Sequence, residues 1–200
     1  MARSLWRRFW HFIWEEDSAA SWIVNVILAF IIIKFIVYPG LGWMLSTTHP
    51  IVAVVSGSME HDGSFDQWWQ NGCGLSSQES LYSAYGINKT QFKDYPQDNG
   101  FNKGDIMILK GGKDPEIGDV IVYSISEQPD PIIHRVVSQS GSPGHNVYKT
   151  KGDHNCGVNP FEEHVDQSQV LGRAVIRVPW LGWVKLAFMQ LVWWVMSLFG

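Results

Sequence analysis

The sequence predicts a mainly β domain, a small antiparallel sheet that is coiled or barrel-like, with an apolar helix at each end of the chain. Three observations lead to this prediction. Short apolar runs separated by Gly-Asp turns fill residues 102–178, with no helical pattern between them. Residues 19–38 are mostly apolar with Lys34 as their only charge, and residues 179–200 are mostly apolar with Lys185 as their only charge. A length of 200 residues suits one domain with such appendages.

The first apolar segment, residues 19–38, is long enough to cross the ~30 Å hydrocarbon core of a bilayer as a helix. It has no small-residue cleavage site at its end, so we interpret it as a permanent anchor. Pro39-Gly40 predict the end of the helix at that point. Basic residues before a span favour a cytoplasmic N-terminus, and the chain begins with Arg3, Arg7 and Arg8. The residues after the span are therefore expected on the extracytoplasmic side.

Residues 1–18 are expected to form a cytoplasmic or interfacial segment. Several large apolar side chains recur there at helical spacing, on one face of a helix. They are Trp6, Phe9, Trp10, Ile13 and Trp14. The chain has eleven tryptophans, and those near the two ends are typical of side chains at membrane interfaces.

The run Ile51–Val55 is apolar and β-branched, which predicts a short buried strand. Ser56-Gly57-Ser58 follows at once and ends the run. A strand that ends in small residues presents a hydroxyl group beside free backbone N–H groups, as a serine nucleophile requires. The plainer interpretation is a polar turn after a strand, and S-G-S alone does not decide between the two.

Residues 62–101 are predicted to be an insertion, rich in Gly, Ser, Gln, Asn and Asp, with a helix over 77–85. It is either a surface subdomain that covers one edge of the sheet or a loop specific for a partner or substrate. The strands expected after it, bounded by turn residues, are 106–109, 120–123, 131–137, 146–150 and 170–178.

His134 lies inside an apolar strand, and Asp153 follows a glycine at a strand end. Each residue by itself has an ordinary structural interpretation, as a packed strand histidine and a turn aspartate. Together with Ser58 they supply a nucleophile, a general base and an orienting acid.

The order of several motifs makes the sequence recognisable. They are VVSGSME, KGDIMIL with IGDVIVY, IIHRVV, YKTKGDHN and VLGRAVIRVPWLGWV. In this order they resemble the type I signal peptidases, in the serine–histidine branch of archaea and of the endoplasmic-reticulum complex. The bacterial branch has a lysine where His134 stands. The resemblance implies a β peptidase domain over residues 39–178, outside the membrane.

The resemblance also implies roles for single residues. Ser58 matches the nucleophile, His134 the general base, and Asp153 the aspartate of the Gly-Asp motif. Ser56 corresponds to a residue that helps the N–H group of Ser58 to form the oxyanion hole. Two positions depart from the family, because His61 replaces a proline and Asn159 replaces a second aspartate.

The residue that orients His134 is therefore left open. Asp153 is one candidate and Asn159 is another, since an amide can also orient a histidine. The nearby carboxylates are the remaining alternatives. They are Glu162, Glu163 and Asp166.

The expected function is that of a membrane-bound serine endopeptidase that removes N-terminal signal peptides, cleaving after small residues of A-x-A type. Its expected partners are signal-peptide-bearing preproteins, the lipid bilayer, and a translocon or accessory subunits. We expect no cofactor and no metal, and the net charge of −4 gives no case for nucleic acid. The alternative is a catalytically degenerate binding or scaffold protein. A repressor-type Ser-Lys protease would need a base lysine and a DNA-binding part, which the sequence lacks.

Two features stay open at the level of sequence. Cys73 and Cys156 either form a disulfide on the extracytoplasmic side or remain thiols. Residues 179–200 form either a second transmembrane helix or an interfacial helix.

Overall fold

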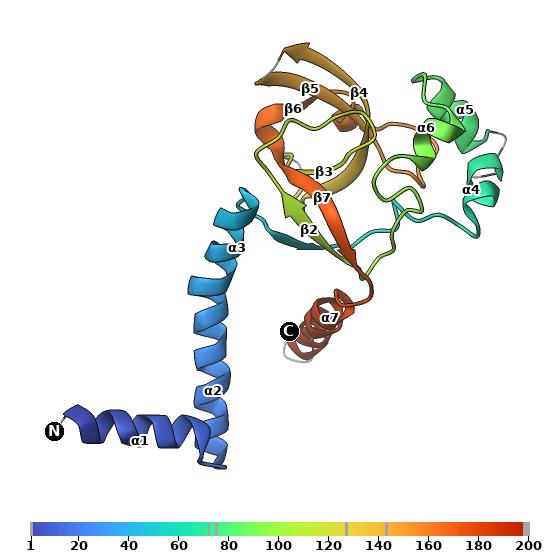
Figure 1. Cartoon of the computed structure of the whole chain (residues 1–200). Helices are drawn as coiled ribbons and strands as arrows, with labels where there is room; N and C mark the ends of the chain where they lie inside the picture. Colours follow the sequence, from blue (N-terminus) through green and yellow to red (C-terminus); the bar gives the residue numbers. More distant parts are fainter. Residues whose placement is uncertain (1, 72, 75, 127, 143, 198–200) are drawn as a thin grey trace. The chain divides into compact units, whose positions relative to one another are not determined.

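The computed structural model describes residues 2–71, 73–74, 76–126, 128–142 and 144–197. It divides into two compact units, Met1–Met44 and Leu45–Gly200. The first unit is helical and the second holds the sheet (Figure 1).

The N-terminal unit consists of helix α1 (Ala2–Trp14), helix α2 (Ala19–Ile32) and the start of helix α3 (Tyr38–Leu45). Two hydrogen bonds fix the corner between α1 and α2. Ser21 Oγ donates to the carbonyl of Phe12 at 2.5 Å, and Asn25 Nδ2 donates to the carbonyl of Ile13 at 2.9 Å. Helix α1 therefore turns away from the axis of α2 (Figure 1).

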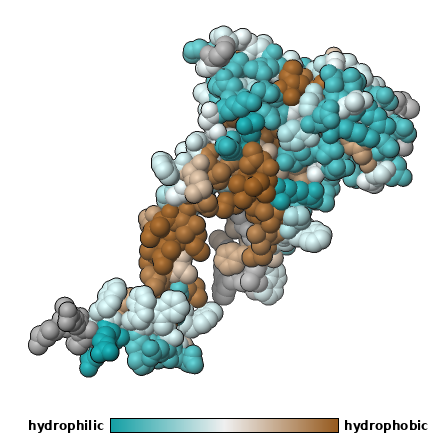
Figure 2. All heavy atoms as spheres, in the orientation of Figure 1, coloured by the Kyte–Doolittle hydropathy of each residue, from teal (hydrophilic) through white to brown (hydrophobic). Residues whose placement is uncertain are grey.

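The helix runs on from α2 into α3, so its predicted end at Pro39-Gly40 is wrong. Residues Ile33–Val37 form a π-helical turn, in which Tyr38 N–H bonds the carbonyl of Ile33. Proline lacks an N–H and crowds the carbonyl four residues before it, and a widened turn relieves both problems. The continuous helix Ala19–Leu45 has 27 residues and the length and apolar composition to cross a membrane. Hydrophobic side chains cover it (Figure 2).

Among the described residues, seven strands form one antiparallel sheet in the order β1-β2-β7-β3-β4-β5-β6. They are β1 (Ile51–Ala53), β2 (Ile106–Lys110), β3 (Val120–Tyr123), β4 (Ile132–Ser142), β5 (His145–Lys151), β6 (Val165–Asp166) and β7 (Val170–Val178). The sheet curls into a half-barrel (Figure 1), which confirms the predicted fold class. Of the strands in the described residues, only the two-residue strand β6 is not predicted from the sequence.

Every side chain of β3 is buried, because apolar clusters pack on both faces of this central strand. Val120 and Val122 pack with Met107 and Leu109 of β2 on one face. Ile121 and Tyr123 belong to the cluster on the other face. The sheet is thus fixed on both sides at the strand that neighbours β4.

The insertion contains the short helices α4 (Phe65–Asn71), α5 (Gln78–Ser83) and α6 (Lys89–Lys93). Ser77 and Asn88 cap α5 and α6 by accepting backbone N–H bonds. The helices enclose an aromatic core of their own, made by Trp68, Trp69, Tyr82 and Phe92 with Ile87 and with Val137 of β4. This core attaches the insertion to the sheet through β4.

Helix α7 (Trp183–Ser197) follows the sheet at the C-terminus. Its 15 residues span about 22 Å, less than the ~30 Å hydrocarbon core of a bilayer. Residues 198–200, the end of the predicted C-terminal helix, lie outside the described residues.

A disulfide joins Cys73 of the insertion to Cys156 in the segment after β5, across a sequence separation of 83 residues. Of the two states left open by the sequence, the structure has the bonded one. The disulfide closes a long loop and should therefore stabilise the fold mainly by restricting the unfolded chain.

We predict that Cys73→Ser lowers the free energy of unfolding by about 2–4 kcal/mol. Denaturant titration of the full chain in detergent would measure this change. Thiol labelling of the unfolded, unreduced wild type should find no reactive thiol. Labelling of both cysteines before reduction would contradict the disulfide.

Candidate active site

Ser58 lies on a turn that follows β1 and that is fixed at both sides. Pairing with β2 continues past the strand, because Val54 N–H bonds the carbonyl of Asp105 and Gly104 N–H bonds the carbonyl of Val54, each at 2.9 Å. Met59, next to Ser58, is fully buried in the main core. The buried methionine holds the turn, while the Ser58 side chain stays partly accessible.

His134 comes from β4, opposite Ile121 of β3. Its Nε2 lies 2.9 Å from Ser58 Oγ, within hydrogen-bond distance. The histidine side chain is only 7% exposed, so the contact is largely shielded from water. This is the arrangement in which a histidine can remove a proton from a serine hydroxyl.

Glu162 occupies the other side of the His134 ring. Its Oε1 lies 2.5 Å from Nδ1 of the histidine, and the carboxylate is fully buried. Glu162 belongs to a 3₁₀ turn, Pro160–Glu162, that Asn159 caps. The backbone N–H and the Nδ2 of Asn159 donate to Oε2 of Glu162 at 2.7 and 2.6 Å.

The charge of Glu162 is stabilised within this site. Burial by itself raises the pKa of the carboxyl group. The contact with His134 and the hydrogen bonds from Asn159 lower it by more, so the pKa of Glu162 lies below its ordinary value. A carboxylate that stays ionised beside Nδ1 can orient the histidine and stabilise an imidazolium.

Asp153, one of the candidates for orienting His134, does not lie beside the histidine. It pairs with Arg135, whose Nε and Nη2 donate to the two carboxylate oxygens at 3.0 and 2.7 Å. His134 and Arg135 are consecutive in β4, and consecutive side chains of a strand point to opposite faces. The acid that binds Arg135 is thus on the wrong side of the strand for His134. Asn159 also reaches Glu162 rather than the histidine.

Arg135 and Asp153 form a fully buried ion pair. The remaining N–H groups of Arg135 donate to the carbonyls of Pro96, Gln97 and Gly118 at 2.8–2.9 Å. All five donors of the guanidinium are therefore used. Tyr82 of the insertion donates to Asp153 Oδ1 at 2.6 Å, and His61 Nε2 lies 3.1 Å from Oδ2.

The ion pair also determines the titration of Asp153. Burial raises the pKa of this carboxyl group, but Arg135 and the contact with His61 lower it by more. The pKa of Asp153 in the folded protein is thus well below its ordinary value. His61 stacks on Trp68 with ring centroids 3.5 Å apart. This contact connects the turn that carries Ser58 to the insertion.

Ser56 is exposed, and its Oγ lies 3.2 Å from Ser58 Oγ. The carbonyl of Ser58 accepts the N–H of His154 at 2.9 Å. Gly152 passes close beneath the pair, because a Cβ at this position would lie 2.8 Å from the carbonyl oxygen of Ser58 and 2.9 Å from Nε2 of His134. Any side chain at this position of the Gly-Asp motif would clash with Ser58 and His134.

Sequence reasoning named Glu162 only as one of several alternatives to Asp153. A signal for it exists in the spacing of Asn159 and Glu162, which is that of a capping box. Such a box fixes one carboxylate oxygen on the cap and leaves the other free for a partner. The roles of Tyr82 and Arg135 have no signal of this kind.

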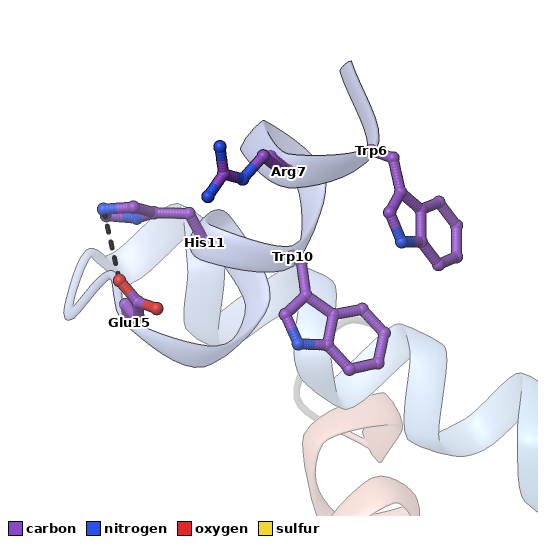
Figure 3. A pocket seen from close by; sticks show the side chains of 5 residues that line it. All are labelled: Trp6, Arg7, Trp10, His11 and Glu15. Atoms are coloured by element: carbon purple, nitrogen blue, oxygen red, sulfur yellow. Dashed lines mark ion pairs between the residues drawn. The ribbon is translucent and has the colours of Figure 1, made fainter. Parts of the chain in front are cut away.

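A hollow on the surface of α1 is lined by Trp6, Arg7, Trp10, His11 and Glu15 (Figure 3). Its ion pair, His11 with Glu15 at 3.4 Å, is exposed. None of these side chains is a nucleophile beside a base, so we do not place the active site there. Among the described residues no group of His, Cys, Asp and Glu is arranged to hold a metal ion.

Comparison with known proteins supports the resemblance seen in the motifs. The chain is 23% identical to a Fusarium vanettenii protein named signal peptidase complex catalytic subunit SEC11, over 88% of this chain and 84% of the relative. Proteins of the same name from Colletotrichum graminicola and Pyricularia oryzae are 25% and 22% identical, covering 88% and 92% of this chain and 84% and 88% of their own. No protein-family model matches the chain.

We predict that Asp153→Asn lowers the free energy of unfolding by about 3–5 kcal/mol, because Arg135 then remains as an uncompensated buried charge. Asp66→Asn, which removes a carboxylate from an exposed pair with Lys89, should have no measurable effect. Denaturant titration of both variants measures the difference. Equal stability of the two would contradict the role given to the buried pair.

The same pair predicts a loss of stability in acid. The pKa of Asp153 in the folded protein lies below the value of 3.8 expected in the unfolded chain. Its contribution is therefore complete above that value and decreases as the pH falls toward the folded pKa. Asp153→Asn should flatten this part of the stability profile of the wild type.

Proposed function

We propose that this chain is a membrane-bound serine endopeptidase that removes N-terminal signal peptides from translocated precursors. The observation that carries the proposal is the series of contacts from Ser58 through His134 to Glu162. The relatives named signal peptidase complex catalytic subunit support it independently. Like those relatives, the chain is proposed to act together with other subunits.

In the proposed reaction, His134 takes the proton of Ser58 as the hydroxyl oxygen attacks the scissile carbonyl. Glu162 stabilises the imidazolium that forms, and the histidine then gives the proton to the leaving amine. The N–H of Ser58 and the hydroxyl of Ser56 stabilise the oxyanion. His134 then removes a proton from a water molecule, which attacks the acyl-enzyme and releases Ser58. No step requires a cofactor.

The proposed substrate path follows the free edge of the sheet. β1 is the terminal strand of the sheet, so its outer edge can pair with an extended peptide. This edge leads directly to the turn that carries Ser58. We propose that the residues just before the scissile bond lie there, and that small residues of A-x-A type are preferred.

The proposed location follows from helix Ala19–Leu45, which is long and apolar enough to cross a bilayer. Arg3, Arg7 and Arg8 favour a cytoplasmic N-terminus. The sheet unit is then extracytoplasmic, as the disulfide of Cys73 also favours. In this arrangement β1 begins soon after the chain leaves the membrane, where the cleavage regions of translocated precursors emerge.

The competing function is a catalytically degenerate scaffold on the same fold. Asn159 and His61 favour this alternative at the level of sequence, because they stand where signal peptidases have an aspartate and a proline. Both now have structural partners, since Asn159 supports Glu162 and His61 contacts Asp153. The contacts around Ser58 favour the enzyme.

The first test is cleavage of a signal-peptide-bearing precursor by the full-length chain in liposomes. Ser58→Ala and His134→Ala should each lower kcat by at least about 10⁴-fold. Ser56→Ala should lower it by about 10²–10³-fold, as expected for one oxyanion donor. Ser83→Ala, an exposed serine of α5, serves as the control. Mass spectrometry of the product locates the cleaved bond.

Three results of such cleavage experiments would contradict the proposal. A folded wild-type chain that leaves the precursor intact would favour the scaffold. Cleavage that survives His134→Ala would exclude this histidine as the base. Equal cleavage of precursors with small and with large residues at the A-x-A positions would contradict the proposed preference.

A second test separates Glu162 from the other acidic residues. Glu162→Gln keeps the shape of the side chain but removes its charge, and we expect kcat to fall by about 10²–10⁴-fold. Glu163→Gln is the matched control, because the neighbouring carboxylate contacts Lys149 rather than the histidine. Loss of activity in both variants, or in neither, would contradict the role proposed for Glu162.

A further inference from the structure

Lys151, the last residue of β5, is a buried cation that the proposed reaction does not use. Its side chain lies inside the unit, and its residue is only 1% exposed. Nζ donates to Oε1 of Gln78 at 2.7 Å and to the carbonyl of Gly152 at 3.0 Å. A third bond goes to the carbonyl of Asp153 at 3.5 Å. The three N–H donors of an ammonium group match these three acceptors.

The two backbone carbonyls belong to a segment that touches the nucleophile's turn at several points. Gly152 lies against Ser58 and His134 without room for a side chain. The N–H of Asp153 approaches Sδ of Met59 at 3.4 Å, and the N–H of His154 donates to the carbonyl of Ser58 at 2.9 Å. A shift of residues 152–154 would therefore move the serine relative to the histidine.

The third acceptor comes from the insertion. Gln78 opens helix α5, directly after its cap Ser77, and is fully buried. Its Nε2 donates to Sγ of Cys73 at 3.3 Å and to the carbonyl of Asn155 at 3.5 Å. The glutamine thus connects the disulfide, the ammonium group and the segment after β5.

We propose that Lys151 is a positioning residue for the peptidase reaction. The insertion holds its ammonium group in place through Gln78. By donating to the carbonyls of Gly152 and Asp153, its ammonium group fixes the segment against which Ser58 and His134 lie. The insertion then acts as an internal support of the active site rather than as a cover of the sheet. This inference rests on the proposed function.

The charged state of Lys151 depends on its buried neighbours. Burial lowers the pKa of the ammonium group, Asp153 and Glu162 raise it, and Arg135 lowers it, with a resulting pKa of about 8. The ring of Tyr82 lies 4.7 Å from Nζ and completes this environment. A neutral amine has two N–H donors and a lone pair, so it cannot serve all three acceptors.

The kinetic consequence is a loss of rate at alkaline pH. We expect kcat of the wild type to fall as the pH rises through about 8. A histidine general base becomes more available as the pH rises, so this loss has to come from another group. If a substitution at Lys151 abolishes this fall of kcat at alkaline pH, Lys151 is the group responsible.

The experiment compares Lys151→Met with Lys149→Met in full-length chains in liposomes. Lys149 lies two residues earlier on the same strand and pairs with Glu163 at the surface, so it is the matched control. For Lys151→Met we expect kcat to fall about tenfold below pH 8, since misplaced reacting groups lower kcat strongly. KM should stay within about twofold, because the substrate does not contact Lys151. The alkaline loss should disappear in this variant.

Gln78→Ala keeps the lysine and tests its link to the insertion, with the exposed Gln70→Ala as control. We expect a smaller fall of kcat, about threefold to fivefold, with the alkaline loss retained. If thermal unfolding shows that Lys151→Met does not fold, the kcat of Gln78→Ala tests whether Lys151 positions the active site.

The outcomes separate this inference from the proposed function. Absence of cleavage by folded wild type would overturn the proposed function and the inference with it. Cleavage by wild type combined with unchanged kcat in Lys151→Met and Gln78→Ala would overturn the inference alone. A higher KM with unchanged kcat, an equal loss in Lys149→Met, or an alkaline loss that persists in Lys151→Met would do the same.

Discussion

The fold around the candidate site depends on one buried ion pair, between Arg135 and Asp153. A buried pair is tolerated only when hydrogen bonds satisfy every remaining donor and acceptor. The guanidinium meets this condition by donating to carbonyls near the end of the insertion and in the turn before β3. The neighbours of the pair along the chain, His134 and Gly152, both lie against Ser58. The pair therefore fixes the backbone on which the candidate site is built.

The alternation of side chains along β4 separates two acidic groups with different roles. Arg135 faces Asp153 and the insertion, and His134 faces Ser58 and Glu162. The Gly-Asp aspartate thus contributes to structure, whereas a glutamate from a capped turn contacts the histidine. Both carboxylates raise the pKa of the buried Lys151. The insertion reaches the same region through Tyr82 and Gln78.

Asn159 and His61, the two positions at which the motifs differ from the signal peptidase pattern, each have a hydrogen-bonding partner in the structure. Asn159 cannot carry a charge, but it donates two hydrogen bonds to Glu162. His61 does not restrict the backbone as a proline would, but it contacts Asp153 and stacks on Trp68 of the insertion. Asn159 thus supports the carboxylate beside His134, and His61 joins the turn that carries Ser58 to the insertion.

The sequence by itself determined the features that depend on local pattern. Runs such as Val120–Tyr123 gave nearly correct strands because β-branched residues and Gly-Asp turns are local signals. The apolar segment from Ala19 was also evident, although the π-helical turn that carries it past Pro39 was not. Ser58 and His134 were found from short motifs, and the structure brings them within 2.9 Å of each other.

Only the tertiary structure decided which acid lies beside the histidine and which residues the insertion contacts. Asp153, Asn159 and Glu162 lie within ten residues of one another, so sequence distance could not choose between them. The choice depends on which face of β4 each side chain reaches, and on the carboxylate that Arg135 already occupies. The bond from Gln78 to Lys151 joins residues far apart in sequence. Contacts of this kind arise from packing in three dimensions, which no local pattern encodes.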